Sequence, residues 1–376
     1  MWLDRFTQRN LELFYSNNEK GKTLLSVLDN TSTPMGSRQL KNWLAFPLID
    51  KTRIEKRLEA VDEFVKDGET RQTVHDQLKK IGDLERMCAR LSLGKLGPKE
   101  AVQLSSGVTC TIPLTEINSN NTFAVSLKKT SKDCLEISRK IDETLTDNPP
   151  ATVSKGNVIK SGINSELDEL RTIAFSGKDY LIQIQERESK ATGISSLKIG
   201  FNNVFGYYLE VTNIHKNKVP EEWIRKQTLV NAERYITEEL KEYEQKILGA
   251  EEKIHSLELD IYTKFIEDLK THIINIQDLA KSVAELDCIV AFAQNAVSLN
   301  YAKPSINNKH QFDIKEGRHP VIEMEMPLGE SYISNDVFLD RDSQQIIMLT
   351  GPNMSGKSAL LRQCALISLM AQIGSF

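Results

Sequence analysis

Residues 350–363 read TGPNMSGKSALLRQ and fit the pattern GxxxxGK[ST] at every fixed position, from Gly351 to Ser358. The apolar run IIML at 346–349 precedes this stretch, and an apolar helical pattern follows it. Glycines at these positions let successive backbone N–H groups face an anion, and the following helix adds the positive end of its dipole. We therefore predict a buried strand, a phosphate-binding loop and a helix, in that order.

The side chains of this loop predict ATP or ADP with Mg²⁺ as the ligand. Lys357 can reach the β- and γ-phosphates, and the hydroxyl of Ser358 can ligate Mg²⁺, so these two are the predicted catalytic residues. No second strand ending in an acidic residue follows the loop, so ATP hydrolysis is not expected from this chain. The predicted nucleotide-binding residues of the loop are Gly351, Pro352, Asn353, Met354, Ser355, Gly356, Lys357, Ser358 and Ala359.

Composition indicates a globular chain without a disulfide framework. The 376 residues, 40% of them hydrophobic, suffice for two or three domains. The five cysteines form no CxxC pair, and the six histidines never fall at HxxxH or HxH spacing, so no zinc site is predicted. The sequence contains no run of 18 apolar residues, so we expect a cytoplasmic protein with no membrane partner. A net charge of −4 argues against a surface that is basic throughout, but it is compatible with a local basic patch.

Upstream of the loop, the hydrophobic period changes twice. Helical patterns dominate the first 110 residues, and a long helix is predicted from 163 to about 190. The stretch 196–212, SLKIGFNNVFGYYLEVT, then alternates apolar and polar residues around NNVFG, which predicts a β-hairpin. A helical pattern with heptad spacing resumes at Glu238 and continues to about Ala296. A small β-rich module is therefore expected between two long helices that can run antiparallel.

The last 70 residues contain three strand candidates. They are HQFDIKEG at 310–317, HPVIEM at 319–324 and SQQIIMLT at 343–350.

Four separated blocks of the sequence resemble the MutS family of DNA mismatch-repair proteins. The stretch 350–376 is similar to the start of the family's ATPase, including its unusual Thr-Gly-Pro-Asn-Met, and GRHPVIE at 317–323 is similar to the segment that opens that domain. The segment 10–48 resembles the start of the family's lever domain, and FNNVFGYYLEV with the following 225–247 resembles its clamp. The resemblance covers nearly the whole chain.

The resemblance implies a fold that is mainly α, with a small β-rich clamp inserted between long helices and a C-terminal start of an α/β P-loop ATPase domain of ABC-like type. The implied divisions are a helical lever and core at 1–160, a lever helix at 161–192, the DNA clamp at 193–237, a returning coiled-coil arm at 238–300, and the N-terminal part of the ATPase domain at 301–376. The chain then resembles an internal piece of such a protein, without the mismatch-reading module and the acidic strand.

Two details bear on this resemblance. The family more often has Gly-Gly-Lys-Ser-Thr in the loop, whereas Ser355 and Ala359 flank Gly-Lys-Ser here, and neither change removes a phosphate-binding group. The mismatch reader of the family uses a Phe-x-Glu motif. Phe265-Ile-Glu267 fits those letters but lies inside the long helical arm, where core packing and an exposed carboxylate are the preferred interpretation.

The predicted DNA contacts lie in the clamp-like module. The stretch from Ser196 to Arg234 contains six Lys or Arg residues and four acidic residues. This modest excess of positive charge also fits an ordinary solvated surface. The clamp resemblance favours contacts to phosphates, which position a protein without reading sequence. The predicted DNA-binding residues are Lys198, Asn202, Asn203, Lys226 and Arg234. Tyr207 and Tyr208 are interpreted as sheet packing.

An adenine-stacking residue is implied by the family, which places an aromatic residue upstream of the loop. In GESYISNDV the matching residue is Tyr332, with Ile333 and Asn335 beside it. An aromatic face suits a purine, although a tyrosine packed in the core is the alternative. His319 is interpreted as structural, with its ring tied to the segment around Pro320.

The sequence therefore predicts a mismatch-repair ATPase of the MutS type, in which ATP binding controls opening and closing of a clamp around mismatched double-stranded DNA. The implied partners are a second copy of the intact protein and a downstream repair ATPase of the MutL type, in a cytoplasmic, nucleoid-associated location. One alternative is a non-catalytic MutS-like clamp for junctions or branched DNA. Another is an ABC-type chromosome-organising ATPase, which ranks last because its P-loop would precede the coiled-coil arm.

Overall fold

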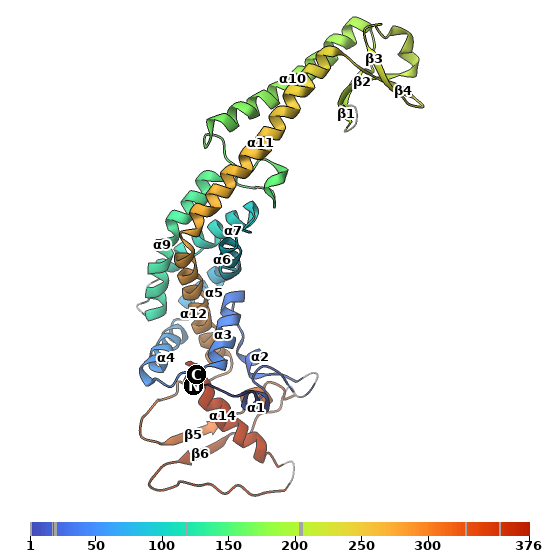
Figure 1. Ribbon diagram of the computed structural model, residues 1–376. Helices are drawn as coiled ribbons and strands as arrows, with labels where there is room; N and C mark the ends of the chain where they lie inside the picture. Colours follow the sequence, from blue (N-terminus) through green and yellow to red (C-terminus); the bar gives the residue numbers. More distant parts are fainter. Residues whose placement is uncertain are drawn as a thin grey trace. The chain divides into compact units, whose positions relative to one another are not determined.

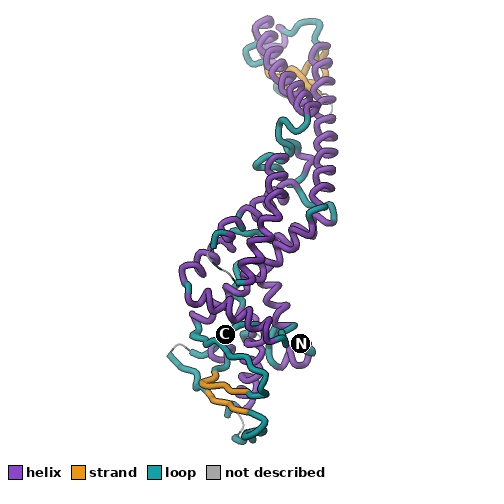
Figure 2. The backbone as a smooth tube through the Cα atoms, turned by 90° about the vertical axis from the view of Figure 1, so that its left-hand side faces the viewer, coloured by secondary structure: helices purple, strands orange, loops and turns teal. Residues whose placement is uncertain are grey.

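The computed structural model describes residues 2–16, 18, 21–117, 119, 121–202, 206–327, 329–352 and 355–376, without the side chains of Gly177 and Lys178. It is mainly helical with small antiparallel sheets, as predicted. The chain divides into two compact units (Figure 1). The first contains Met1–Leu96, Gln103–Lys140 and Leu269–Phe376, and the second contains Gly97–Val102 and Ile141–Asp268. The strands, orange in Figure 2, form one sheet in each unit.

The first unit is a helical bundle followed by a small α/β part. Its helices up to the long central one are α1 (Arg5–Asn10), α2 (Leu24–Leu28), α3 (Pro34–Ala45), α4 (Lys51–Lys66), α5 (Gly68–Leu78), α6 (Leu84–Ser92), most of α7 (Pro98–Thr109), α8 (Ile112–Thr115), most of α9 (Thr122–Thr144) and α12 (Ile273–Ser298). The α/β part contains β5 (Phe312–Gly317), α13 (Pro320–Glu323), β6 (Asn335–Leu339) and α14 (Lys357–Ile373).

Helix α12 is the centre of this bundle and contacts α3, α4, α5 and α6. Its side chains are buried on nearly every face, which is the pattern expected of a core helix. The Trp43 ring of α3 lies 6.1 Å from the Phe292 ring of α12 and 6.5 Å from the Phe123 ring of α9. Aromatic packing therefore joins three helices that are far apart in the sequence.

A buried carboxylate on α12 fastens the loop that precedes α3. Asp287 accepts hydrogen bonds from the backbone N–H groups of Ser32 and Thr33, each at 2.8 Å, and from the Thr33 hydroxyl at 2.7 Å. The Thr33 oxygen in turn accepts from the N–H of Gly36 and caps α3. A side chain at Gly36 would overlap Asp287. The loop and the central helix are therefore held in one arrangement.

The α/β part of the first unit corrects two predictions. Residues 319–324 were predicted as a strand, but Pro320–Glu323 form the short helix α13, because Pro at the first helical position and the His319 cap favour a helical turn. Residues 346–349, predicted as a buried strand, have no regular structure, and Ile346 and Met348 are 83% and 86% exposed. A strand needs a neighbour to bond its backbone, and β5 and β6 pair only with each other among the described strands.

The predicted strand at 310–317 is confirmed as β5, which pairs antiparallel with β6. The register shifts between Ile314 and Gly317, so that Gly317 lies opposite Asn335 at the start of β6. Helix α14 follows the phosphate-binding loop, as predicted, and contacts β5, α3 and α4.

The second unit is an antiparallel pair of long helices with a sheet, as the sequence predicts (Figure 1). Helix α10 (Ser165–Thr192) leads into β1 (Lys198–Asn202), β2 (Gly206–Thr212), the 3₁₀ segment η2 (Asn213–Lys218), β3 (Ile224–Thr228) and β4 (Ala232–Ile236), and α11 (Glu238–Lys270) returns. The sheet is antiparallel in the order β1-β2-β4-β3. A short 3₁₀ turn, η1 (Val153–Lys155), lies in the Pro- and Gly-containing segment before α10.

The core of this unit joins the two helices to the sheet. It consists of Leu181, Ile184, Ile194, Leu197, Leu209, Val211, Trp223, Tyr235, Leu240 and Ile247. Further along the helices, Arg171 of α10 donates to the fully buried Glu258 of α11 at 2.6 Å, which adds a charged contact between them. Among the described residues, no helix is long and apolar enough to cross a membrane.

We predict a pH-dependent contribution from Asp287 to the stability of the first unit. Burial raises the pKa of Asp287 from about 3.8 to about 6. The folded state therefore holds this proton more tightly than the unfolded chain, so the stabilisation is complete below pH 4 and is lost as the pH rises through 6. The free energy of unfolding of the wild type minus that of Asp287→Asn should fall by about 2 kcal/mol from pH 4 to pH 7.

The measurement is urea unfolding followed by Trp43 fluorescence, with Trp2 and Trp223 replaced by phenylalanine. Other titrating groups, including His75 beside Ser32, are common to both proteins and cancel in the difference. A difference that stays constant or grows with pH would contradict the assignment.

Candidate functional site

Helix α14 begins at the predicted phosphate-binding loop. Gly356 is the N-cap residue and has φ +85°, in the left-handed region that glycine adopts without strain. Among the described residues, no side chain caps the first backbone N–H groups of the helix. The start of α14 also carries the positive end of the helix dipole. Asn353 and Met354 lie outside the described residues.

Lys357 folds back over this loop. Its Nζ donates to the carbonyl oxygen of Gly351 at 2.6 Å, to the carbonyl oxygen of Pro352, and weakly to the Ser355 hydroxyl at 3.4 Å. These partners are neutral oxygens, and a phosphate would offer the ammonium group a stronger, charge-assisted bond. The Ser358 side chain is exposed in the first turn of α14 and is not among the residues that line the adjacent pocket.

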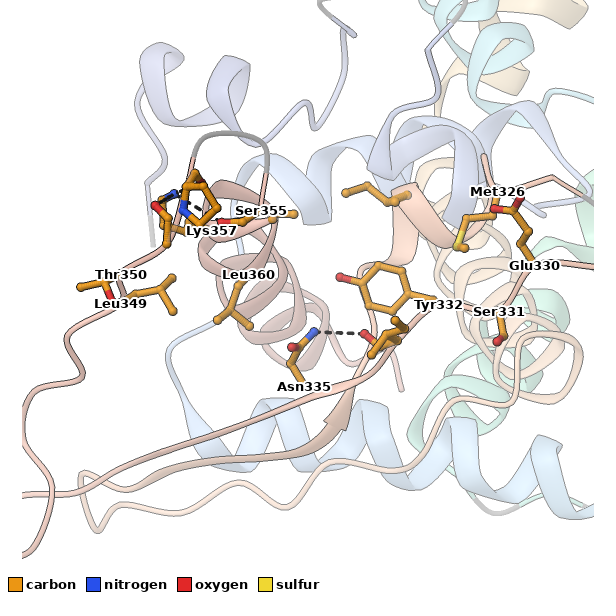
Figure 3. Close-up of a pocket in the computed structure, with 16 residues that line it drawn as sticks. Met326, Glu330, Ser331, Tyr332, Asn335, Leu349, Thr350, Ser355, Lys357 and Leu360 are labelled. Carbon is orange, nitrogen blue, oxygen red and sulfur yellow. Dashed lines mark hydrogen bonds between the residues drawn. The ribbon is translucent and has the colours of Figure 1, made fainter.

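A pocket of about 920 Å³ lies against this loop, within the size range of small-molecule sites. Its lining includes nine of the predicted nucleotide-binding residues, namely Gly351, Pro352, Ser355, Gly356, Lys357, Ala359, Tyr332, Ile333 and Asn335. The rest of the lining consists of Ile322, Met326, Glu330, Ser331, Leu349, Thr350 and Leu360. In Figure 3 the Lys357 side chain lies at one side of this pocket, and the Tyr332 ring lies between it and the side chains of Met326 and Glu330. The structure therefore brings the loop and the predicted aromatic residue to one cavity.

Tyr332 is half-buried and lies in the segment before β6, not in a strand. Its hydroxyl donates to the side-chain carbonyl of Gln363 at 3.0 Å, and burial raises its pKa. The neighbouring Ile333 is exposed, while Asn335 donates from Nδ2 to the Ile333 carbonyl at 3.1 Å. The ring of Tyr332 thus faces the pocket while its hydroxyl is fixed to α14.

His319 has the predicted structural role. Its Nδ1 accepts from the backbone N–H groups of Val321 at 3.3 Å and Ile322 at 3.2 Å, which caps α13. Burial lowers the pKa of His319, which favours the neutral ring that this acceptor role requires.

Sequence reasoning missed Gln363, which lies six residues after Lys357 on α14 and is fully buried. A signal was available, because a glutamine on the inner face of an otherwise apolar helix needs a polar partner. It also missed Ile322, Met326, Glu330 and Ser331 as parts of the pocket wall.

Within the described part of the chain, no cluster of three or more His, Cys, Asp or Glu could hold a metal ion. Ser358 offers a single oxygen ligand. A Mg²⁺ ion at this loop would therefore need the oxygens of a bound phosphate group as well.

The predicted DNA-binding residues fall in different environments on the sheet of the second unit. Lys198 begins β1 and Lys226 lies at the register shift of β3, and both side chains are exposed. Arg234 of β4 is instead held in the sheet: its Nε donates to Glu210 at 3.1 Å, and its guanidinium lies 4.3 Å from the centre of the Tyr208 ring. Asn202 ends β1, and Asn203 lies outside the described residues.

The local charge balance is changed by one buried acid. Glu233 pairs with Lys216 at 3.0 Å and with Arg225 at 3.3 Å, and it accepts from the Tyr235 hydroxyl. The Tyr235 hydrogen bond and Lys216 together lower the pKa of Glu233. Two of the six basic residues counted in the sequence are therefore bound to this carboxylate. Lys198 and Lys226 have no such carboxylate among the ion pairs of the described residues.

The β1–β2 hairpin is fastened to α11 by Glu244. The Glu244 carboxylate accepts from the Tyr207 backbone N–H at 3.2 Å and lies where a side chain at Gly206 would be. Gly206 also has φ +75°, which favours glycine. The hairpin that carries Lys198 and Asn202 is thus oriented by a helix.

Most of the chain matches models of known protein families. The family model described as MutS domain III matches residues 6–293, and the model described as MutS domain V matches residues 347–376. The chain is 54% identical over 378 residues to the DNA mismatch repair protein MutS of Christiangramia forsetii, covering 100% of this chain and 43% of that protein. It is 52% identical over 376 residues to the protein of the same name from Bacteroides fragilis, covering 100% and 44%. The chain thus spans less than half the length of these relatives.

We predict that Gly206→Ala loosens the β1–β2 hairpin. A methyl group there overlaps the Glu244 carboxylate and meets a left-handed backbone, so the Tyr207 N–H loses its acceptor. Hydrogen exchange measured by mass spectrometry should become faster in peptides covering 206–212. The matched control is Gly249→Ala in α11, where nothing lies within 4 Å of the added methyl group and alanine favours the helix. Equal exchange in the Gly206→Ala protein and the wild type would contradict this role of Glu244.

Proposed function

The chain belongs to the MutS family of DNA mismatch-repair proteins, and from this premise we propose that it binds ATP or ADP at residues 350–360 and a DNA duplex at the four-stranded sheet. The observation that carries the first part is the position of Lys357, whose Nζ is held on the carbonyl oxygen of Gly351 at a helix start that no described side chain caps, in the lining of a pocket. The exposed pair Lys198 and Lys226 supports the second part.

At the nucleotide site, each residue has a proposed task. The backbone N–H groups from Gly351 to Ser358 and the start of α14 bind the phosphates, as helix N-termini do in P-loops. Lys357 exchanges its carbonyl partners for β- and γ-phosphate oxygens, and Ser358 contributes an oxygen to Mg²⁺. Tyr332 stacks on the adenine ring, with Ile333 and Asn335 beside it.

At the sheet, the proposed contacts are to the DNA backbone. Lys198 and Lys226 neutralise phosphates, and Asn202, Asn203 and Arg234 add hydrogen bonds that position the duplex. Arg234 would share its guanidinium with Glu210 in this arrangement. Because the relatives are named as mismatch-repair proteins, a mismatched duplex is favoured over branched DNA as the target.

In the intact protein, we propose that nucleotide occupancy shifts a clamp between open and closed states. The divisions at 160, 192, 237 and 300 are the proposed domain boundaries. Helix α11 of the clamp unit is followed after two residues by α12, the central helix of the unit that carries the nucleotide site. A second copy of the protein and a MutL-type repair ATPase are the proposed protein partners.

Replacing Lys357 tests the nucleotide site. Lys357→Ala removes the charged donor, so the Kd for Mg·ATP in isothermal titration calorimetry should rise by about 10- to 100-fold. The control is Lys129→Ala, which removes an exposed lysine of α9 and should leave the Kd unchanged. Equal Kd values for Lys357→Ala and wild type would refute the site.

Replacing Lys198 and Lys226 together tests the DNA surface. If each contacts one phosphate, the double alanine variant should lower the slope of log K against log salt by about 2 in magnitude. The control is Lys129→Ala with Lys132→Ala, two exposed lysines of α9 in the first unit. Binding should be followed by fluorescence anisotropy of a labelled duplex between 50 and 200 mM salt. The same slope in both double variants would place the DNA elsewhere.

A further inference from the structure

The proposed adenine platform is attached to the helix that carries the phosphate cradle. The Tyr332 hydroxyl donates to Oε1 of Gln363 at 3.0 Å, and Gln363 is a residue of α14. Burial, with a smaller contribution from the nearby charge of Glu323, raises the pKa of this hydroxyl. The ring is thus fixed at its far end and open to the pocket on its face.

Gln363 is itself held in one place by its surroundings. The side chain is fully buried, and its Nε2 has no hydrogen-bond partner among the described residues. A methyl group at Gly317 would lie 2.5 Å from that Nε2, so the amide packs closely against β5 at a position where only a glycine fits. A buried amide with an unpaired donor is costly, and Tyr332 is the partner that satisfies its other end.

We propose that Gln363 is a positioning residue that sets the distance between the adenine-binding ring and the phosphate-binding loop. This inference rests on the proposed nucleotide site and deepens it. Lys357 and Gln363 are six residues apart on one helix, a rise of about 9 Å along its axis. The distance between the groups that bind the base and the phosphates is then set by α14.

This arrangement depends on the tyrosine hydroxyl. A phenylalanine at 332 would keep the stacking surface but could not bond to Gln363. The ring would then be free to move with its own segment, and some of the binding energy would be spent on ordering it. The hydroxyl therefore affects recognition of the base and leaves recognition of the phosphates unchanged.

The experiment compares Mg·ATP with Mg·tripolyphosphate, which has no base, on the 376-residue chain. Wild type, Tyr332→Phe, Gln363→Met and the double variant are titrated by calorimetry. Each single variant should bind Mg·ATP about fivefold more weakly than the wild type. The affinity of the double variant for Mg·ATP should be no lower than that of the weaker-binding single variant, because both changes remove the same hydrogen bond. Mg·tripolyphosphate should bind equally to all four proteins. Adenine H8 should also receive less saturation transfer relative to ribose H1′ in Tyr332→Phe.

Several results would overturn the inference. One is that Tyr332→Phe binds Mg·ATP as tightly as the wild type does. Another is that the fold-losses in Mg·ATP affinity of the two single variants multiply in the double variant. A third is that the variants lose affinity for tripolyphosphate as much as for Mg·ATP. Tyr332→Phe removes one oxygen atom from a half-buried side chain, so the test stands even if Gln363→Met does not fold. If the wild type bound neither ligand, the nucleotide site itself would be wrong, which distinguishes that failure from a failure of the tether alone.

Discussion

The position of α14, the helix that carries the proposed nucleotide site, depends on how its C-terminal carbonyl groups are satisfied. Arg57 of α4 donates to the Ile373 carbonyl at 2.9 Å, and the backbone N–H of Leu48 donates to the Gln372 carbonyl at 3.3 Å. The Arg57 guanidinium lies 3.4 Å from the centre of the Trp43 ring, and burial lowers its pKa to about 10, so it stays charged at neutral pH. Gly374 ends the helix in a left-handed conformation beside the Arg57 stem. One end of α14 is thus locked into the helical core.

This constraint explains why the other end of α14 can serve a ligand. A helix held by its C-terminal groups and its buried face does not need a side-chain cap at its start, and no described side chain caps α14 at Gly356. Lys357 then occupies the carbonyl oxygens of its own loop. The helix joins the aromatic core around Trp43, the glycine-rich loop and the Tyr332 ring in a single element.

The parts of the fold that sequence could predict are those determined by local patterns. The hairpin at 196–212 and the long helices have a clear hydrophobic period, and their described parts formed where expected, except that the helical pattern from 238 to 296 is divided into α11 and α12 between Lys270 and Ile273. Residues 346–349 were mispredicted because an apolar run becomes a strand only when neighbours bond its backbone, and no described strand does so. The glycine-rich loop could be located from its spacing, but the Tyr332–Gln363 contact required the fold. Likewise, charge counting could not show that Glu233 binds Lys216 and Arg225.

The most direct test of the account is a crystal structure of the 376-residue chain with Mg²⁺ and a non-hydrolysable ATP analogue. We expect the Lys357 ammonium to leave the carbonyl oxygens of Gly351 and Pro352 and to contact the phosphates. Ser358 should contact the Mg²⁺ ion, and the purine should lie against the Tyr332 ring. An analogue bound away from the loop, with Lys357 still on those carbonyl oxygens, would contradict it.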